Sequence, residues 1–450
     1  MGEVKVPEDA YYGAQTQRAV ENFTLSGLRF PAPFIRALGM IKKHAALVNR
    51  ELRLLDSNLA DSIVAAAQEV CEGKRDDQFV VDVFQTGSGT STNMNANEVI
   101  AGRANELLKG LRGGKSPVHP NDHVNLGQSS NDVIPSAIHV AALLQIEKHL
   151  IQALDRLEAA LQDKAVTFQS IRKIGRTHLQ DAVPVTLGQE FSGYARQVEL
   201  GIERLKAVEP RLSELALGGT AVGTGVNTHP RFAEKVIAGI SGETGVPFRE
   251  ALNHFEAQAG QDAVVETSGI LKTVAVSMIK IAQDVRWLAS GPRCGLGEII
   301  IPGLQPGSSI MPGKVNPVIP EAVLQVCVQV IGHDGAITLG GQFGNFELNV
   351  MLPMMAYNLL QSIQWLGEAA AAFAEKCIKG ITANRGKCSS YLEQSLALAT
   401  PLVPYIGYDR AASLAKKAFD SNRTIREVAV ADRVLPEEEI HRILDKLVGD

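Results

Sequence analysis

The sequence predicts a mainly all-α fold, because apolar residues recur at helical spacing over long stretches while signals for strands are sparse. From Leu271 to Leu288, apolar side chains step by alternating threes and fours, and 143–161 and 191–215 show the same pattern. Each pattern puts its apolar residues on one stripe of a long helix, which has to pack against other helices. We therefore expect a bundle of long helices. Two further members are expected at 319–338 and 350–376.

Three domains are predicted along the chain. Residues 1–128 contain helices punctuated by Gly and Pro and form an N-terminal, mostly helical domain. Residues 129–385 form the central long-helix bundle, and residues 386–450 form a small C-terminal domain of short helices. Apolar stripes of this length exceed what one chain can easily cover, which favours an oligomer.

The composition limits the possible functions. Hydrophobic residues make up 45% and charged residues 21% of the chain, as expected for a soluble globular protein. The net charge of −5 gives no indication of a nucleic-acid partner. No run of 18 or more apolar residues and no N-terminal targeting pattern is found, so we expect no membrane span and a cytoplasmic location. Five scattered cysteines predict neither a disulfide framework nor a thiolate metal site.

Four polar clusters, far apart in the sequence, are candidates for a binding or catalytic site. The first, Thr86–Asn95, contains Ser88 and Thr90 in a glycine-bearing turn before helix-like sequence. The free N–H groups of a helix N-terminus suit a carboxylate, although a simple capping turn has the same composition. A dinucleotide-binding fingerprint is excluded because the glycine pattern fails after Gly89.

The second cluster lies between Val118 and Asp132. Its residues Ser129, Ser130 and Asn131 directly precede a long helix, where they can cap the helix or donate to a bound carboxylate. His119 and His123, next to Asp122, have a spacing that suggests a metal site. Because Pro120 disfavours a regular helix there, we expect no metal.

The third and fourth clusters carry groups suited to proton transfer. His178 stands beside Thr177 and close to an amide and a carboxyl group, which can orient an imidazole that titrates near neutral pH. The fourth cluster is the loop Gly307–Pro317, in which Gly and Pro can hold a strained turn. Its polar members are Ser308, Ser309, Lys314 and Asn316, and Glu321 follows on an apolar stretch. Together the clusters offer a base, hydroxyl and amide donors, and a cation, which are the requirements of a β-elimination next to a carboxylate.

The loop Gly307–Pro317 closely resembles the signature loop of the fumarase/aspartase superfamily. The resemblance extends over nearly the whole chain, from Tyr11–Thr16 to Ile406–Tyr408. Within the superfamily the sequence looks most like the class II fumarases, because Gly313 stands where aspartases usually have alanine and Phe346–Val350 is fumarase-like. The resemblance implies a lyase of the tricarboxylic acid cycle that interconverts L-malate and fumarate through an aci-carboxylate intermediate.

The resemblance also implies roles for individual residues. Ser308 is the expected base for the C3 proton, and His178, supported by Glu321, is expected to handle the water that leaves C2. Lys314 and Asn316 are expected to hold the carboxylate that becomes the aci form. The remaining substrate-binding residues implied are Ser88, Thr90, Ser129, Ser130, Asn131, Thr177 and Ser309, and an accessory dicarboxylate site is implied at His119, Asn121 and Asp122.

In such enzymes the four clusters come from three subunits of a homotetramer, and no cofactor is required. A small dicarboxylate is then the expected partner. Two alternatives remain: an aspartate ammonia-lyase, since the segment Val318–Glu321 is common in that family, and a catalytically silent helical scaffold, which predicts the loss of polar site residues. No such loss is seen in the sequence.

Overall fold

The computed structural model describes residues 2–448, so residue 1 and residues 449–450 of the outer predicted domains lie outside the described part. The chain is mainly helical, which confirms the predicted fold class. Its contacts define two compact units, each assembled from three stretches of chain. Unit 1 comprises 1–152, 203–275 and 328–367, and unit 2 comprises 153–202, 276–327 and 368–450. The three-domain division stays a prediction.

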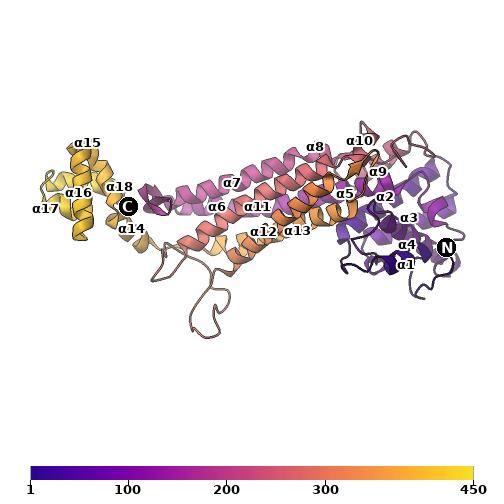
Figure 1. Cartoon of the computed structure of the whole chain (residues 1–450), viewed down its shortest axis with the longest axis horizontal. Coiled ribbons are helices and arrows are strands. Elements are labelled where there is room, and N and C mark those ends of the chain that lie inside the picture. The colour runs from indigo at the N-terminus through magenta and orange to yellow at the C-terminus, as the bar shows by residue number, and fades with distance from the viewer. Residues whose placement is uncertain (1, 449–450) are drawn as a thin grey trace. The chain divides into compact units, whose positions relative to one another are not determined.

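Unit 1 is built around helix α2 (Ala32–Glu51), which packs against several other helices of the same unit. Phe34, Leu38 and Ile41 lie on one face of α2 and are completely buried. Figure 1 shows the N-terminal helices gathered in one group. The other short helices of this unit are α1 (Ala14–Asn22), α3 (Ser57–Cys71), η1 (Asp76–Gln78), α4 (Thr90–Lys109), η2 (Pro120–Val124), α9 (Phe232–Thr244) and α10 (His254–Ala259).

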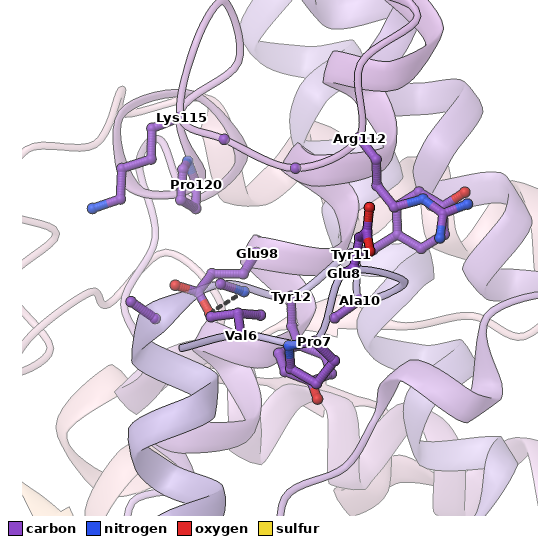
Figure 2. Close-up of a pocket in the computed structure, with 14 residues that line it drawn as sticks. Val6, Pro7, Glu8, Ala10, Tyr11, Tyr12, Glu98, Arg112, Lys115 and Pro120 are labelled. Atoms are coloured by element: carbon purple, nitrogen blue, oxygen red, sulfur yellow. Dashed lines mark hydrogen bonds between the residues drawn. The ribbon is translucent and has the colours of Figure 1, made fainter. Parts of the chain in front are cut away.

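A buried carboxylate anchors the N-terminal segment of unit 1. Glu98 on α4 accepts hydrogen bonds from the backbone N–H groups of Gly13, Gln15 and Thr16 at 3.0, 3.1 and 2.9 Å. The Thr16 hydroxyl donates to the same carboxylate at 2.7 Å. These donors belong to the first turn of α1, whose N–H groups have no partner within the helix. Glu98 therefore explains why the segment follows a fixed path along a cavity of about 320 Å³ (Figure 2).

The long helices agree with the predicted periodicity, with one exception. The expected helix over 191–215 ends at Ala207, and Pro210 stands in the short helix that follows. Proline supplies no backbone N–H and clashes with the preceding turn, so the long helix cannot continue through it. The observed helices are α5 (Ser130–Gln145), η3 (Ile146–Leu150), α6 (Ile151–Thr167), α7 (Leu187–Ala207), α8 (Glu209–Leu212), α11 (Asp262–Leu288), α12 (Val318–Gly341) and α13 (Leu352–Lys376).

Polar contacts join the long helices within unit 1. Lys272 on α11 forms an ion pair with Asp334 on α12 at 2.6 Å. One residue earlier on α12, the His333 imidazole contacts the hydroxyl of Ser362 on α13 at 3.0 Å. Both α12 side chains are buried, so these contacts satisfy polar groups that would otherwise be costly to bury. The three helices are thereby joined side by side as neighbours in a bundle.

Helix α12 is by length and composition apolar enough to cross a membrane, and one third of its most apolar window is buried within the chain. Val328 is 63% exposed and Leu339 is 59% exposed. These residues are eleven positions apart, close to three helical turns, and therefore lie on the same stripe. Val328 and Leu339 thus form an exposed apolar stripe on α12.

Unit 2 contains a second group of short helices around its own core. Leu402, Leu414, Val428 and Leu444 are among the buried residues of this core. Figure 1 shows these C-terminal helices packed together. They are α14 (Arg385–Gln394), η5 (Leu396–Leu402), α15 (Val403–Ile406), α16 (Tyr408–Ser421), α17 (Ile425–Ala431) and α18 (Glu437–Val448), and η4 (Ile378–Gly380) precedes them.

Strands are few and short, as the sequence predicts. The longest pair is the antiparallel hairpin of β1 (Arg172–Thr177) and β2 (Gln180–Thr186) in unit 2. The other strands form two-residue pairs: β3 (Glu214–Leu215) with β4 (Arg249–Glu250), β5 (Ile299–Ile300) with β8 (Thr382–Ala383), and β6 (Gly344–Asn345) with β7 (Leu348–Asn349).

The five cysteines are free thiols. Cys327, Cys377 and Cys388 are buried, Cys71 is half-buried and Cys294 is exposed. Burial raises the pKa of the thiols of Cys71, Cys327 and Cys377 to about 12.

Candidate functional site

The first two polar clusters meet in unit 1. Ser88 precedes α4 and its hydroxyl lies 2.8 Å from that of Thr90, the first residue of the helix. The Thr90 hydroxyl lies 2.7 Å from that of Ser130, forty positions further along the chain. A chain of three hydroxyls thus links the N-termini of α4 and α5. Because a helix N-terminus favours negative charge, a corner where two of them meet is suited to an anion.

Ser129 is the N-cap of α5. Its hydroxyl accepts from the Asn131 backbone N–H at 3.2 Å, and its own N–H donates to the Asp132 carboxylate at 2.9 Å. These bonds form a capping box, which satisfies helix donors that have no other partner. The capping role predicted from the sequence is therefore confirmed for Ser129.

A glycine-rich segment, residues 218–227, packs against this corner and belongs to none of the four polar clusters. The Asn131 side-chain amide donates to the carbonyl of Ala221 at 2.8 Å. The buried carboxylate of Asp132 accepts from the backbone N–H groups of Gly218 and Thr220, both at 3.0 Å. Residues 218–227 contain four glycines, and this composition is the signal by which the segment could have been found.

Gly87 explains how the turn that carries Ser88 is held. A Cβ at position 87 would lie 1.9 Å from the carbonyl oxygen of Val350, so a larger residue cannot fit. The Gly87 carbonyl accepts from the N–H of Leu352 at 3.0 Å. The start of α13 therefore packs directly on the turn through backbone atoms.

The third cluster forms the turn of the β1–β2 hairpin in unit 2. Thr177 pairs with Gln180, which leaves His178 and Leu179 as a two-residue turn. Both turn residues have left-handed backbone conformations, with φ of 55° and 59°. A left-handed conformation costs a residue other than glycine about 1–2 kcal/mol. The turn exposes the His178 side chain, so it is available to a ligand.

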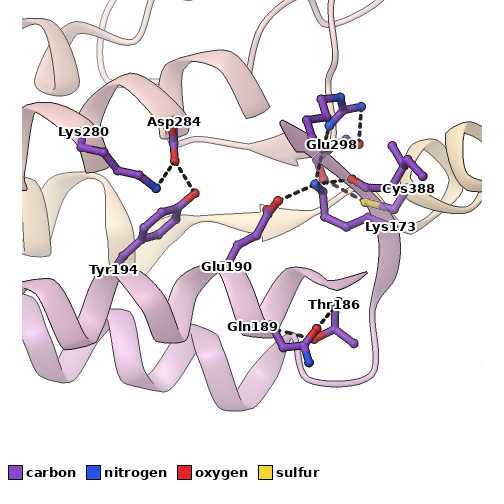
Figure 3. A network of polar contacts seen from close by, with 11 residues as sticks. Lys173, Thr186, Gln189, Glu190, Tyr194, Lys280, Asp284, Glu298 and Cys388 are labelled. Carbon is purple, nitrogen blue, oxygen red and sulfur yellow. Dashed lines mark hydrogen bonds and ion pairs between the residues drawn. The ribbon is translucent and has the colours of Figure 1, made fainter. Parts of the chain in front are cut away.

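A buried charge network supports this hairpin (Figure 3). Arg176, which directly precedes Thr177, forms two hydrogen bonds with the carboxylate of Glu298 at 3.0 and 2.9 Å. The Glu298 side chain is completely buried and also lies 3.3 Å from Lys173 Nζ. Lys173 in turn donates to Glu190 at 2.7 Å. Burial raises the pKa of Glu190, and Lys173 opposes this effect.

The network continues along α7. Tyr194 lies one helical turn beyond Glu190, and its hydroxyl donates to Asp284 on α11 at 2.9 Å. Burial, reinforced by the charge of Asp284, raises the pKa of Tyr194. The tyrosine therefore stays protonated and acts as a hydrogen-bond donor between the two helices.

The fourth cluster is a closed loop in unit 2. The N–H of Gly307 donates to the carbonyl of Lys314 at 2.7 Å, and the Asn316 side chain donates to the carbonyl of Gly307 at 2.8 Å. Within the loop, the Ser308 hydroxyl oxygen accepts from the N–H groups of Ile310 and Met311, at 3.2 and 3.1 Å. Two amide donors aimed at one hydroxyl oxygen stabilise negative charge on that oxygen. Ser309 is exposed on the same loop.

This loop borders a cavity of about 700 Å³ in unit 2. Lys314, Asn316 and Glu321 line the cavity together with Arg286 from α11. The Glu321 carboxylate is 3.9 Å from the Arg286 guanidinium. Among the hydrogen bonds of residues 2–448, none joins Glu321 to His178.

The accessory cluster forms a short π-helical turn in unit 1. Pro120 occupies the first position of this turn, where the missing N–H is tolerated. His119 Nδ1 accepts from the N–H groups of Asn121 and Asp122, at 3.3 and 3.2 Å. Its Nδ1 also lies 3.3 Å from the Asp122 carboxylate. In the part of the chain that the structure describes, no group of three or more His, Cys, Asp or Glu side chains is placed to hold a metal ion.

The chain shows similarity to known proteins over nearly its full length. Residues 2–332 match the Lyase family, and residues 398–447 match the Fumarase C C-terminus family. The sequence is 60% identical over 445 residues to the class II fumarate hydratase of Halobacterium salinarum, covering 99% of this chain and 94% of the relative. It is 56% identical over 430 residues to that of Nitrosomonas europaea, covering 96% of this chain and 93% of the relative.

A solved structure has the same fold. The class II fumarase of Schistosoma mansoni is 40% identical, with a TM-score of 0.95 and coverage of 99% of this chain and 96% of that one. The hydroxyl corner, the hairpin histidine and the Ser308 loop thus stand in a chain that belongs to the lyase family and, within it, to the class II fumarate hydratases.

Proposed function

We propose that this chain is a fumarate hydratase that interconverts L-malate and fumarate by reversible anti-elimination of water. One observation carries the chemistry: the Ser308 hydroxyl oxygen accepts two backbone N–H bonds from its own loop. A serine is a weak base unless its alkoxide is stabilised, and such donors provide that stabilisation. The family membership of the chain supports the same reaction.

In the proposed mechanism, Ser308 acts as an alkoxide and takes the proton from C3 of malate, which returns it to the hydroxyl form. The electrons move into the adjacent carboxylate, which becomes a dianionic aci form. Lys314 and Asn316 stabilise this dianion by charge and by hydrogen bonding. His178 assists the departure of the hydroxyl group from C2 as water, with Glu321 as its partner, and the double bond of fumarate forms.

The substrate carboxylates and hydroxyl are held by the hydroxyl corner and by two further residues. The corner consists of Ser88, Thr90, Ser129, Ser130 and Asn131. Its position at two helix N-termini supports a role in binding a carboxylate. Thr177 and Ser309 complete the set. We place a second dicarboxylate at His119, Asn121 and Asp122, where Nδ1 of the histidine is already fixed by two backbone donors.

The enzyme works as a homotetramer whose subunits share each active site. Two features support this assembly. Helix α12 carries an exposed apolar stripe, and Glu321 has Arg286 rather than His178 as its neighbour within the chain. A partner subunit can supply both the cover for the stripe and the histidine for the glutamate. The reaction belongs to the tricarboxylic acid cycle, needs no cofactor, and we place it in the cytoplasm.

The test is to add L-malate to the purified protein and follow the ultraviolet absorbance of fumarate. A steady increase in absorbance after malate is added, and a steady decrease after excess fumarate is added, support the proposal. A parallel incubation with L-aspartate measures ammonia. Release of ammonia without turnover of malate would replace the proposed function by aspartate ammonia-lyase.

A further inference from the structure

A completely buried lysine lies directly behind the hydroxyl corner of unit 1. Lys42 on α2 has no exposed surface. Its ammonium donates to the side-chain oxygens of Asn125 and Gln128, both at 2.9 Å. A lysine is almost never fully buried unless specific partners compensate for its lost hydration. None of the steps of the proposed mechanism uses this residue, so its burial requires another explanation.

The partners of Lys42 belong to the segment that leads into the corner. Gln128 immediately precedes Ser129, the N-cap of α5. The Asn125 side chain donates to the Gln128 carbonyl at 3.1 Å, which ties the two partners to each other. Asn125 Oδ1 also accepts from Asn93 and Asn97 on α4, at 3.2 and 3.1 Å. The ammonium and these amides therefore join α2, α4 and the start of α5 at one point.

The charges around Lys42 define its electrostatic role. Burial lowers the pKa of Lys42 to about 7, and the buried carboxylate of Asp132 on α5 opposes this effect.

Other charged groups on the helices that pack against α2 have partners of their own. Glu243 of α9 binds Lys43 and His44, and Glu98 of α4 binds the start of α1. On η2, Asp122 is exposed, and His123 Nδ1 accepts from a backbone N–H. On α3, Glu69 is paired with Arg75 and Arg103, and Glu72 with Lys74.

We propose that Lys42 is a positioning residue for substrate binding, which fixes the segment 125–128 and places a positive charge behind Ser129, Ser130 and Asn131. This inference rests on the proposed function, because it takes the corner as the site of a substrate carboxylate. An ammonium buried behind a helix N-terminus adds to the positive potential that a dianion meets there. Because dianion binding and the protonation of Lys42 are linked, a bound dianion also favours the protonated form of Lys42.

Substrate affinity therefore depends on the protonation of Lys42. Both carboxyl groups of a dicarboxylate are ionised at neutral pH, so the charge of the substrate does not change in this range. As the pH rises above about 7, Lys42 loses its proton in the free enzyme, and binding has to restore that proton. The KM for malate then increases with pH, while kcat follows the catalytic groups.

The experiment compares Lys42→Met with Lys43→Met. Lys43 is a matched control, since it is the next residue on α2, is also buried, and binds Gln68 and Glu243 instead of the corner segment. We expect Lys42→Met to raise the KM for malate about tenfold, equivalent to about 1.4 kcal/mol, with kcat within about twofold of wild type. The increase of KM above pH 7 disappears in this variant and persists in Lys43→Met.

Lys42→Gln serves as the second variant if methionine prevents folding, because it keeps an N–H donor and removes the charge. A variant with the wild-type KM at every pH, or an equal loss of pH dependence in Lys43→Met, would overturn the role of Lys42. A wild-type protein that turns over neither malate nor fumarate would instead overturn the proposed function. The two failures are thus distinguished by the wild-type assay.

Discussion

At the residue scale, a few groups owe their proposed chemistry to neighbours that only the fold supplies. Ser308 is an ordinary hydroxyl in the sequence, but its oxygen faces two amide donors in the folded loop. His178 owes its exposure to a turn in which two successive residues have positive φ. In both cases the local backbone gives the side chain its proposed property: amide donors for the Ser308 oxygen, and exposure for the His178 imidazole.

Replacement of Ser308 by alanine tests this preparation. We expect Ser308→Ala to lower kcat by roughly 10³-fold, as is typical for the loss of a group that transfers a proton in the transition state. The KM and the melting temperature should stay close to wild type, since Ser308 is only half-buried and the substitution removes a single hydroxyl. Steady-state kinetics and thermal unfolding measure these quantities. A wild-type kcat would rule out Ser308 as the base.

The buried charge of Lys42 also predicts how stability depends on pH. The unfolded chain holds this proton up to the ordinary pKa of 10.5, whereas the folded chain loses it above about 7. Between these values the unfolded state binds more protons, so the Lys42 contribution to the free energy of unfolding rises with pH. Lys42→Met lacks this contribution.

The stability of wild type relative to Lys42→Met should therefore increase steadily from pH 7 to pH 10. Urea denaturation of both proteins at several pH values in this window measures the difference. Parallel curves for the two proteins would show that Lys42 keeps its proton throughout, contrary to the expectation.

At the scale of elements, the β1–β2 hairpin is the part of the site that the sequence describes least well. The polar residues Thr177 and His178 are recognisable in the sequence, but the strained two-residue turn formed by His178 and Leu179 is not. Such turns usually contain Asn or Gly, which adopt positive φ at little cost. Here the Arg176–Glu298 pair supplies tertiary support that a local sequence pattern cannot reveal.

Removing that support should destabilise unit 2. Among residues 2–448, Arg176→Met leaves the completely buried Glu298 with Lys173 as its one charged partner, at a cost of about 3–5 kcal/mol. The control is Arg196→Met, which removes an exposed ion pair with Glu199 and should cost less than about 1 kcal/mol. Chemical denaturation gives both values, and similar losses for the two variants would contradict a special role of the buried pair.

The helical elements were more predictable than the hairpin. Apolar residues predicted both bounds of α12 and α13 to within three residues, and they predicted the end of α11 at Leu288. Helix α11 begins at Asp262, nine residues before the first residue of its predicted stripe. The exception was the helix expected to reach residue 215, which ends at Ala207 instead. The prediction used only the spacing of apolar residues, and this spacing does not register Pro210 near the expected end. The segment 218–227 was overlooked because its contribution is made through backbone N–H groups, which side-chain chemistry does not indicate.

At the scale of the whole molecule, helix α12 connects the single chain with its proposed assembly. Its composition satisfies the requirements of a membrane span as well as those of a buried bundle helix. The buried pair His333 and Asp334 favours the bundle, because polar groups in a bundle can find protein partners such as Lys272. In the proposed homotetramer, the exposed stripe through Val328 and Leu339 is the expected surface between subunits.

The double substitution Val328→Asp and Leu339→Asp tests this assignment. Burying two carboxylates between apolar helices is unfavourable, so we expect the tetramer to dissociate and malate turnover to fall with it. Sedimentation velocity measures the mass of the assembly. The matched control, Val328→Ala with Leu339→Ala, shortens the stripe without adding charge and should remain tetrameric. A tetrameric Asp variant would place the interface elsewhere.

The distribution of thiols in the chain has a practical consequence. Alkylating reagents attack thiolates, and burial keeps Cys71, Cys327 and Cys377 protonated far above neutral pH. Cys294 is exposed and follows Pro292, which lines the cavity bordered by Lys314. A maleimide fluorophore should therefore label the native chain selectively at this position. A change of its emission on addition of a dicarboxylate is the expected signal of binding at the proposed site, and it can be recorded without turnover.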